Sequence, residues 1–246
     1  MAQFDALGTG LSGARAAEID QGLRAHMNKV YGTMSVGMLI TFAVAWAIGS
    51  SPDLLSFLRD PQTLQPNILG YIVMFAPLAF VFGLSAGINR ISAATAQVVF
   101  YAFAAVMGLS LSWIFAAFTG VSIATTFLAT SVGFAAMSLY GYTTNRDLSG
   151  MGRFLMMGVI GLIVAMIANW FIQSGPLAMA ISAIGVLIFA GLTAYDTQKI
   201  KTDYIAHAMH GDSEWLGKSA IMGALMLYLD FINMFMFLLQ FLGNRE

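Results

Sequence analysis

The sequence predicts an all-α membrane protein with seven transmembrane helices, in which the last helix is central and surrounded by the other six. Of its 246 residues, 59% are hydrophobic and only 9% are charged, and the mean hydropathy is +0.78. These values lie far outside the range of soluble globular domains. Seven apolar stretches have the length of a membrane span. The last stretch carries an acid near its middle, which has to face protein or water and not lipid.

Each of the seven stretches is within or close to the roughly 17–25 residues that a spanning helix needs. Turn-forming residues such as Gly175 and Pro176 separate them. The expected spans are Val30–Gly49, Ile68–Ile88, Ala96–Phe118, Ile123–Tyr140, Phe154–Ile172, Leu177–Tyr195 and Ala220–Leu242.

The segment before the first span, residues 1–29, is polar and glycine-rich. It lacks the apolar run of a cleavable signal peptide, so the first membrane helix is expected to direct insertion. We expect residues 1–29 to form a cytoplasmic N-terminal tail and residues 30–246 to form the seven-helix transmembrane domain.

Lysine and arginine are distributed unevenly between the two sides of the expected bundle. Only Arg59 and Arg245 fall on one side. The other nine are Arg15, Arg24, Lys29, Arg90, Arg146, Arg153, Lys199, Lys201 and Lys218. Because cytoplasmic loops carry the excess of positive residues, the chain is expected to be a multi-pass membrane protein with its N-terminus in the cytoplasm and its C-terminus outside.

Asp230 lies near the middle of the last span, ten residues and therefore about 15 Å from its start. An acid at that depth costs on the order of several kcal/mol unless it faces protein or water. Spacings of three and four residues place Asn233 and Gln240 on the same helical seam as Asp230. Buried intramembrane acids usually mark an ion or proton pathway. A neutral, hydrogen-bonded structural acid is the alternative.

Asp196 is the second candidate, because it follows Tyr195 at the expected cytoplasmic end of span six. A solvated helix end is an equally simple explanation of this acid. If Asp196 and Asp230 approach one another, they cannot both ionise freely in a low-dielectric site, so they share a proton and titrate as a unit. Two carboxylates near carbonyl groups also offer the oxygen ligands that Ca²⁺ prefers.

The cysteine and histidine content argues against disulfides and against most metal sites. The chain has no cysteine, which rules out disulfides and thiolate metal sites. His207 and His210 are three residues apart and could bind a metal, although a solvated connector between spans is the favoured interpretation. No cofactor and no nucleic-acid partner are expected.

An intramembrane aspartyl protease is a remote enzymatic alternative, because such enzymes also place a Tyr-Asp pair on one helix and a second aspartate on the next. Their second aspartate follows a Gly-x-Gly pattern. Here Leu227, Tyr228 and Leu229 precede Asp230. The protein is therefore not expected to be an enzyme.

Three segments resemble the bacterial inner-membrane branch of the Bax inhibitor family, also called the transmembrane Bax inhibitor motif family. They read GLTAYDTQKIK, LYLDFINMFMFLLQFLGNR and MSLYGYTTNRDLSG. The resemblance extends from about Met27 to Arg245. It implies a seven-helix fold with an enclosed last helix. It also implies a pH-sensitive calcium leak channel with paired acids as the sensor and an arginine after span two as a latch.

By position, Asp196 and Asp230 correspond to the two sensor acids, and Arg90 corresponds to the latch. We expect transient calcium binding at the two acids, with Tyr195 and Asn233 as supporting polar residues. The expected partners are the lipid bilayer and calcium or other cations. A non-conducting membrane regulator that binds a membrane protease or a stress-response partner is the main alternative function.

The charge distribution predicts that the two termini lie on opposite sides of the membrane. Topology reporters fused at residue 1 and after residue 246 should give a cytoplasmic signal and an external signal, respectively, because seven spans reverse the side. Two signals from the same side would mean that one of the seven spans is wrong.

Overall fold

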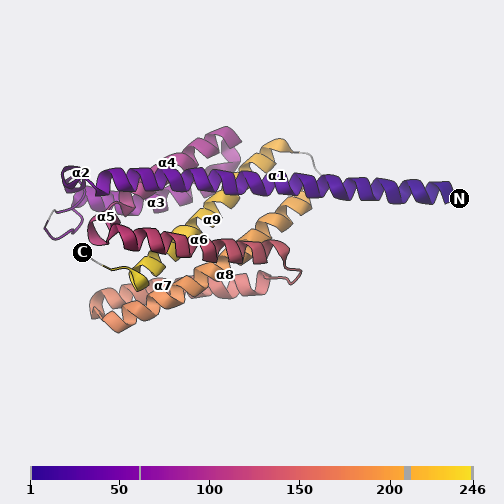
Figure 1. The fold of residues 1–246 in the computed structure, drawn as a ribbon. Coiled ribbons are helices and arrows are strands. Elements are labelled where there is room, and N and C mark those ends of the chain that lie inside the picture. The colour runs from indigo at the N-terminus through magenta and orange to yellow at the C-terminus, as the bar shows by residue number, and fades with distance from the viewer. Residues whose placement is uncertain (1, 61, 208–211, 245–246) are drawn as a thin grey trace.

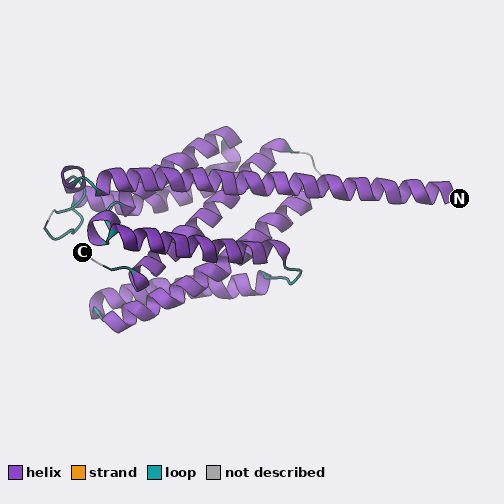
Figure 2. Ribbon diagram, in the orientation of Figure 1, coloured by secondary structure: helices purple, strands orange, loops and turns teal. Residues whose placement is uncertain are grey.

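The computed structural model describes residues 2–60, 62–207 and 212–244, with side chains from residue 17 onward. Within these residues the fold consists of helices joined by turns and loops, without a strand (Figure 1, Figure 2). His210 and Arg245, which were discussed above, lie outside the residues that the structure describes. The elements are α1 (Ala2–Gly49), α2 (Pro52–Ser56), α3 (Ile68–Gly87), the 3₁₀ helix η1 (Ile88–Arg90), α4 (Ala93–Leu111), α5 (Ile114–Ala117), α6 (Gly120–Thr143), α7 (Ser149–Ile172), α8 (Gly175–His207) and α9 (Ser213–Leu242).

Seven helical segments are long and apolar enough to cross a membrane, which confirms the predicted number and class of the spans. They are Ala17–Gly49, Ile68–Arg90, Ala93–Ala117, Gly120–Thr143, Ser149–Ile172, Gly175–His207 and Ser213–Leu242.

Polar side chains cap several of these helices at the points where the chain turns. Asn67 accepts a hydrogen bond from the backbone N–H of Gly70 at the start of α3, at 2.9 Å. Asp212 does the same for two N–H groups in the first turn of α9, both at 3.0 Å. Because the first N–H groups of a helix lack partners within the helix, such side chains fix where each span begins.

The packed domain begins earlier than the expected boundary at residue 30. Helix α1 starts at Ala2, and its buried face already includes Leu23 and Met27. These positions continue the spacing of buried Val30 and Met34 by three and four residues, so they extend the same apolar stripe. Part of the segment expected to be a tail therefore packs as helix.

Helix α8 runs to His207, about three turns beyond the expected end of span six at Tyr195. The extension is stabilised by Ile200 and Tyr204, which lie one turn apart and are buried against the rest of the bundle. Asp196 consequently lies inside a helix and not at a solvated helix end.

Helix α9 is the most buried of the seven spans. In its apolar window 67% of the residues are buried, compared with 6% in α7. Figure 1 shows α9 running obliquely between α1, α3 and α4 on one side and α6, α7 and α8 on the other. Its main neighbours are α1, α4, α6 and α8, whereas α3 packs mainly on α4 and α7 mainly on α8. The expected arrangement, in which all six other spans surround the last helix, is therefore not confirmed.

Close packing of α6 on α8 depends on Gly141. A Cβ atom at this position would lie 2.1 Å from the backbone oxygen of Ala194 and 2.9 Å from its Cα. Neither backbone atom can move without displacing α8, which carries Asp196 two residues further along. Gly141 thus sets the depth at which α8 sits in the bundle.

Gly141→Ala should lower the thermal stability of the purified protein in detergent, because overpacking of this kind costs about 1–3 kcal/mol. Gly133→Ala is the matched control on the same helix, since no atom lies within 4 Å of the added Cβ there. The control should be neutral or stabilising through its better helix propensity. Equal melting temperatures for the two variants would contradict the close approach of α6 and α8.

Candidate functional site

Asp230 lies at the centre of the molecule, on the most buried helix. Its side chain is only 4% exposed, and its neighbours include the buried side chains of Leu227 and Phe231 on the same helix. Within the described residues, Asp230 Oδ2 is fully buried and has no hydrogen-bond partner. An unsatisfied carboxyl oxygen in an apolar bundle is costly, and such atoms commonly mark functional positions.

Asp196 on α8 is the immediate neighbour of Asp230. The two carboxyl groups interact with each other directly, and Asp196 also interacts electrostatically with Lys199 one turn further along α8. Asp196 is partly buried. The structure therefore brings together the two acids that the sequence analysis singled out, from two helices that pack along each other.

A hydroxyl chain leads from α1 to the helix that carries Asp196. Tyr31 Oη lies 2.5 Å from Ser138 Oγ on α6, and Ser138 Oγ lies 3.0 Å from Thr197 Oγ1 on α8. Thr197 follows Asp196 directly in the sequence. These hydrogen bonds join α1, α6 and α8 at one level of the bundle.

A second polar contact joins α1 to the helix that carries Asp230. Thr41 Oγ1 lies 2.7 Å from Tyr228 Oη and 2.8 Å from the backbone oxygen of Ala104. Tyr228 is fully buried and packs edge-on against Phe100 and Phe103. This contact fixes α9 two residues before Asp230.

Tyr195 and Asn233, the expected supporting residues, are not hydrogen-bonded to either acid in the part of the chain that the structure describes. The Tyr195 ring lies against Gly152 of α7, where α7 packs on α8. Asn233 donates a hydrogen bond to the backbone oxygen of Leu229 at 2.8 Å. A supporting role for these two residues stays a prediction.

A cavity of about 290 Å³ lies toward the C-terminal end of α9. Asn233 and Gln240 supply polar groups to its wall, and Trp113 and Met236 supply apolar ones. Asn233 is three residues from Asp230, so the cavity ends about one helical turn from the buried acid. The cavity thus lies on the side of the acid pair that faces the expected outer surface.

Arg90 lies in the exposed 3₁₀ turn η1 after α3. The ion pairs among the described residues do not include Arg90 with Asp196. The structure does not bring the two together, and the latch stays a prediction about another state of the protein.

His207 contacts its own helix and α9, and its possible metal-binding partner His210 lies outside the described residues. His207 Nδ1 lies 2.9 Å from the backbone oxygen of Asp203, and its ring stacks on Trp215 with centroids 4.0 Å apart. The described residues contain no group of three or more His, Cys, Asp or Glu side chains that could hold a metal ion.

The loop acids are held in their ionised form. Backbone N–H groups of Thr63 and Gln62 donate hydrogen bonds to Asp60 and keep its pKa below the ordinary value. Hydrogen bonds from the side chain and backbone of Ser149 likewise keep the pKa of Asp147 low. Neither acid can therefore gain or lose its charge near neutral pH.

The sequence analysis did not identify the hydroxyl groups of Tyr31, Thr41, Ser138 and Thr197. Their polar character within apolar spans was a signal, but it is ambiguous. Hydroxyl groups in membrane helices also bond to the backbone of their own helix, as Thr130 does to Thr126 at 2.8 Å.

Comparison with known proteins identifies the family of the chain. The family model described as "Inhibitor of apoptosis-promoting Bax1" matches residues 23–246. The inner membrane protein YbhL of Escherichia coli K12 is 46% identical over 225 residues, which cover 92% of this chain and 94% of YbhL. Protein RP147 of Rickettsia prowazekii is 44% identical over 227 residues, with 92% of each chain covered. A protein of Borreliella burgdorferi is 40% identical over 220 residues, which cover 89% of this chain and 91% of the relative.

The extent of these matches agrees with the packed part of the structure, because the family match begins at Leu23, the first buried residue among the α1 side chains that the structure describes. The chain is a multi-pass membrane protein that belongs to the Bax inhibitor family.

Proposed function

We propose that this protein is a pH-sensitive cation leak channel of the inner membrane with calcium as its permeant ion, and that Asp196 and Asp230 are its sensor and its ion pathway. The observation that carries the proposal is the burial of Asp230 beside Asp196 in the centre of a membrane bundle, with one carboxyl oxygen unsatisfied. A purely structural role would favour an apolar residue at this position.

The charges around the pair determine how it responds to pH. Lys199 is the cation that acts on Asp196, and Asp196 is the charged group that acts on Asp230. Two carboxyl groups this close in a low-dielectric site cannot both ionise freely, so the pair shares a proton at low pH, whereas the positive charge of Lys199 favours the ionised form of Asp196. Loss of that proton leaves a second negative charge in the bundle. The added charge attracts cations and repels the α8 and α9 carboxylates from each other.

The cavity near Asn233 and Gln240 supports a path from the outer surface toward the acids. Amide oxygens at Asn233 and Gln240 followed by carboxylates at Asp230 and Asp196 form a sequence of oxygen ligands along α9 and α8. Calcium prefers such hard oxygen ligands, and it takes about 6–8 of them when it is tightly held. Two acids supply too few for storage, which favours transient binding and release.

In the proposed mechanism, Arg90 acts only when the protein changes from one conformation to another. The helix that precedes it, α3, packs mainly on α4 and contains Pro77 within its length. A missing backbone donor loosens a helix locally, so the end of α3 can approach or leave α8 more easily than an enclosed helix could. We propose that a closed state contains an Arg90–Asp196 ion pair.

Calcium flux into liposomes should rise as the pH rises through the titration range of the pair, because deprotonation adds the charge that attracts the cation. Asp230→Asn should abolish most of this pH response, since an amide cannot ionise. Asp203→Asn is the matched control, because Asp203 is exposed on the same helix as Asp196.

The sensor role would be refuted by a wild-type pH–flux curve in both Asp196→Asn and Asp230→Asn. Absence of any flux from folded wild-type protein would instead favour the non-conducting regulator that binds a membrane protease or a stress-response partner.

Arg90→Ala should increase flux at a pH at which the wild type is mostly closed. Loss of a partly exposed pair worth about 1 kcal/mol would shift the ratio of open to closed protein roughly fivefold. The measurement is calcium flux for Arg90→Ala, Asp196→Ala and the double variant, with Arg146→Ala as a control for lost positive charge. Additive effects of the two single changes would mean that the residues do not act as a pair.

A further inference from the structure

A groove lies between α1 and α6, with α9 as its floor. It has a volume of about 1030 Å³, at the upper end of the range of about 300–1,000 Å³ that is typical of ligand pockets. Helices α1 and α6 contact each other little, which leaves room for the groove between them.

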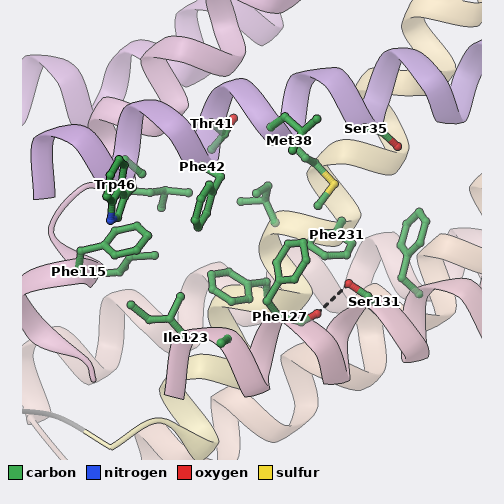
Figure 3. Close-up of a pocket in the computed structure, with 18 of the residues that line it drawn as sticks. Ser35, Met38, Thr41, Phe42, Trp46, Phe115, Ile123, Phe127, Ser131 and Phe231 are labelled. Atoms are coloured by element: carbon green, nitrogen blue, oxygen red, sulfur yellow. Dashed lines mark hydrogen bonds between the residues drawn. The ribbon is translucent and has the colours of Figure 1, made fainter. Parts of the chain in front are cut away.

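Aromatic side chains from both walls point into this groove (Figure 3). Phe127 of α6 contacts Phe231 and Phe235 on the floor, with ring centroids 5.5 and 6.4 Å apart. On the opposite wall, Phe42 of α1 contacts Phe115 edge-on at 5.9 Å. The interior of the groove is therefore an apolar, mainly aromatic surface.

The groove opens toward the hydrocarbon of the membrane and not toward water. Both of its walls belong to membrane-spanning segments. Its rim carries large apolar side chains, of which Leu39 is 67% exposed and Phe42 is 52% exposed. Water would find few hydrogen-bond partners on such a surface, whereas a hydrocarbon chain would contact it over its whole length.

The groove is long enough to hold one chain of a lipid. Its lining begins at Tyr31 of α1 and ends at Ser50, just after α1, a span of nineteen residues or about 28 Å. This length is close to that of the ~30 Å hydrocarbon core. Trp46 lies within one turn of the end of α1 at Gly49, and tryptophan is enriched at the depth of the headgroups. The groove thus begins at one interface and extends through most of the hydrocarbon core.

We propose that the groove between α1 and α6 is a binding site for one acyl chain of a membrane phospholipid. The headgroup lies near Trp46 and Ser50, and the chain runs inward between Phe42 and Phe127 to the aromatic floor at Phe231. Binding at this site does not depend on cation conduction.

Photo-crosslinking tests the proposal in liposomes of phosphatidylethanolamine and phosphatidylglycerol that contain a phospholipid with a diazirine on one acyl chain. Phe231 and Phe235 are only 3% and 5% exposed, so lipid that stays outside the groove cannot reach them. Labelling of the α9 peptide that contains them is therefore expected. Label on α7, where Phe171 is 77% exposed, measures contact with bulk lipid.

Ala124→Trp places a large ring inside the groove, and Ser35→Trp does so from the opposite wall; both parent residues are exposed residues that line the groove. Each variant should reduce α9 labelling at least fivefold relative to α7 labelling. Ala129→Trp is the matched control, because Ala129 is exposed on α6 but does not line the groove. It should leave the ratio unchanged, and gel filtration verifies that all three variants are folded.

Three results would overturn the proposal. The first is the absence of label on α9 in the wild type. The second is a ratio of α9 to α7 labelling that neither filling variant changes. The third is protein–protein crosslinking across this face in place of lipid label, which would identify a second copy of the chain as the occupant.

Discussion

The burial of one carboxyl group, that of Asp230, is the constraint on which the rest of the structure depends. A chain can place an acid at mid-membrane depth only if the helix that carries it is shielded from lipid, and α9 is shielded by α1, α4, α6 and α8. Shielding of this kind requires close helix contacts, as at Gly141, where α6 reaches the backbone of α8. It also requires that the helix of the neighbouring acid, Asp196, lies directly alongside.

The sequence predicted the parts of this fold that depend on composition and length. The number of spans follows from the apolar stretches of bilayer length. The burial of α9 follows from its acid, Asp230, which cannot face lipid. The two acids could be identified because charged residues are rare in such stretches. The sequence did not predict the start of the packed domain near Leu23 or the extension of α8 to His207, because amphipathic helix outside the membrane has no strong hydropathy signal.

The site was predictable only in part, for a related reason. The acids are rare in apolar spans and therefore conspicuous, whereas hydroxyl groups such as Thr41 and Ser138 are common there and can always bond to their own helix. Tertiary packing decides which hydroxyl group forms a hydrogen bond with another helix instead. Arg90 illustrates the same limit for long side chains, because its place after α3 can be read from the sequence, whereas its pairing with Asp196 stays a prediction.

Because α8 is long, a structural change at the acid pair would also affect parts of the molecule far from the pair. Its 33 residues make a rod of about 50 Å, well beyond the ~30 Å of hydrocarbon. Asp196 lies about 16 Å from the end of this rod, and Tyr204 on the protruding part packs against the ring of His26 on α1, with centroids 4.9 Å apart. Because a helix is stiff along its axis, a tilt of α8 that began at the acids would displace its far end most. The proposed conduction within the membrane and the alternative function, recognition of a partner beyond the membrane, would then both involve this one helix.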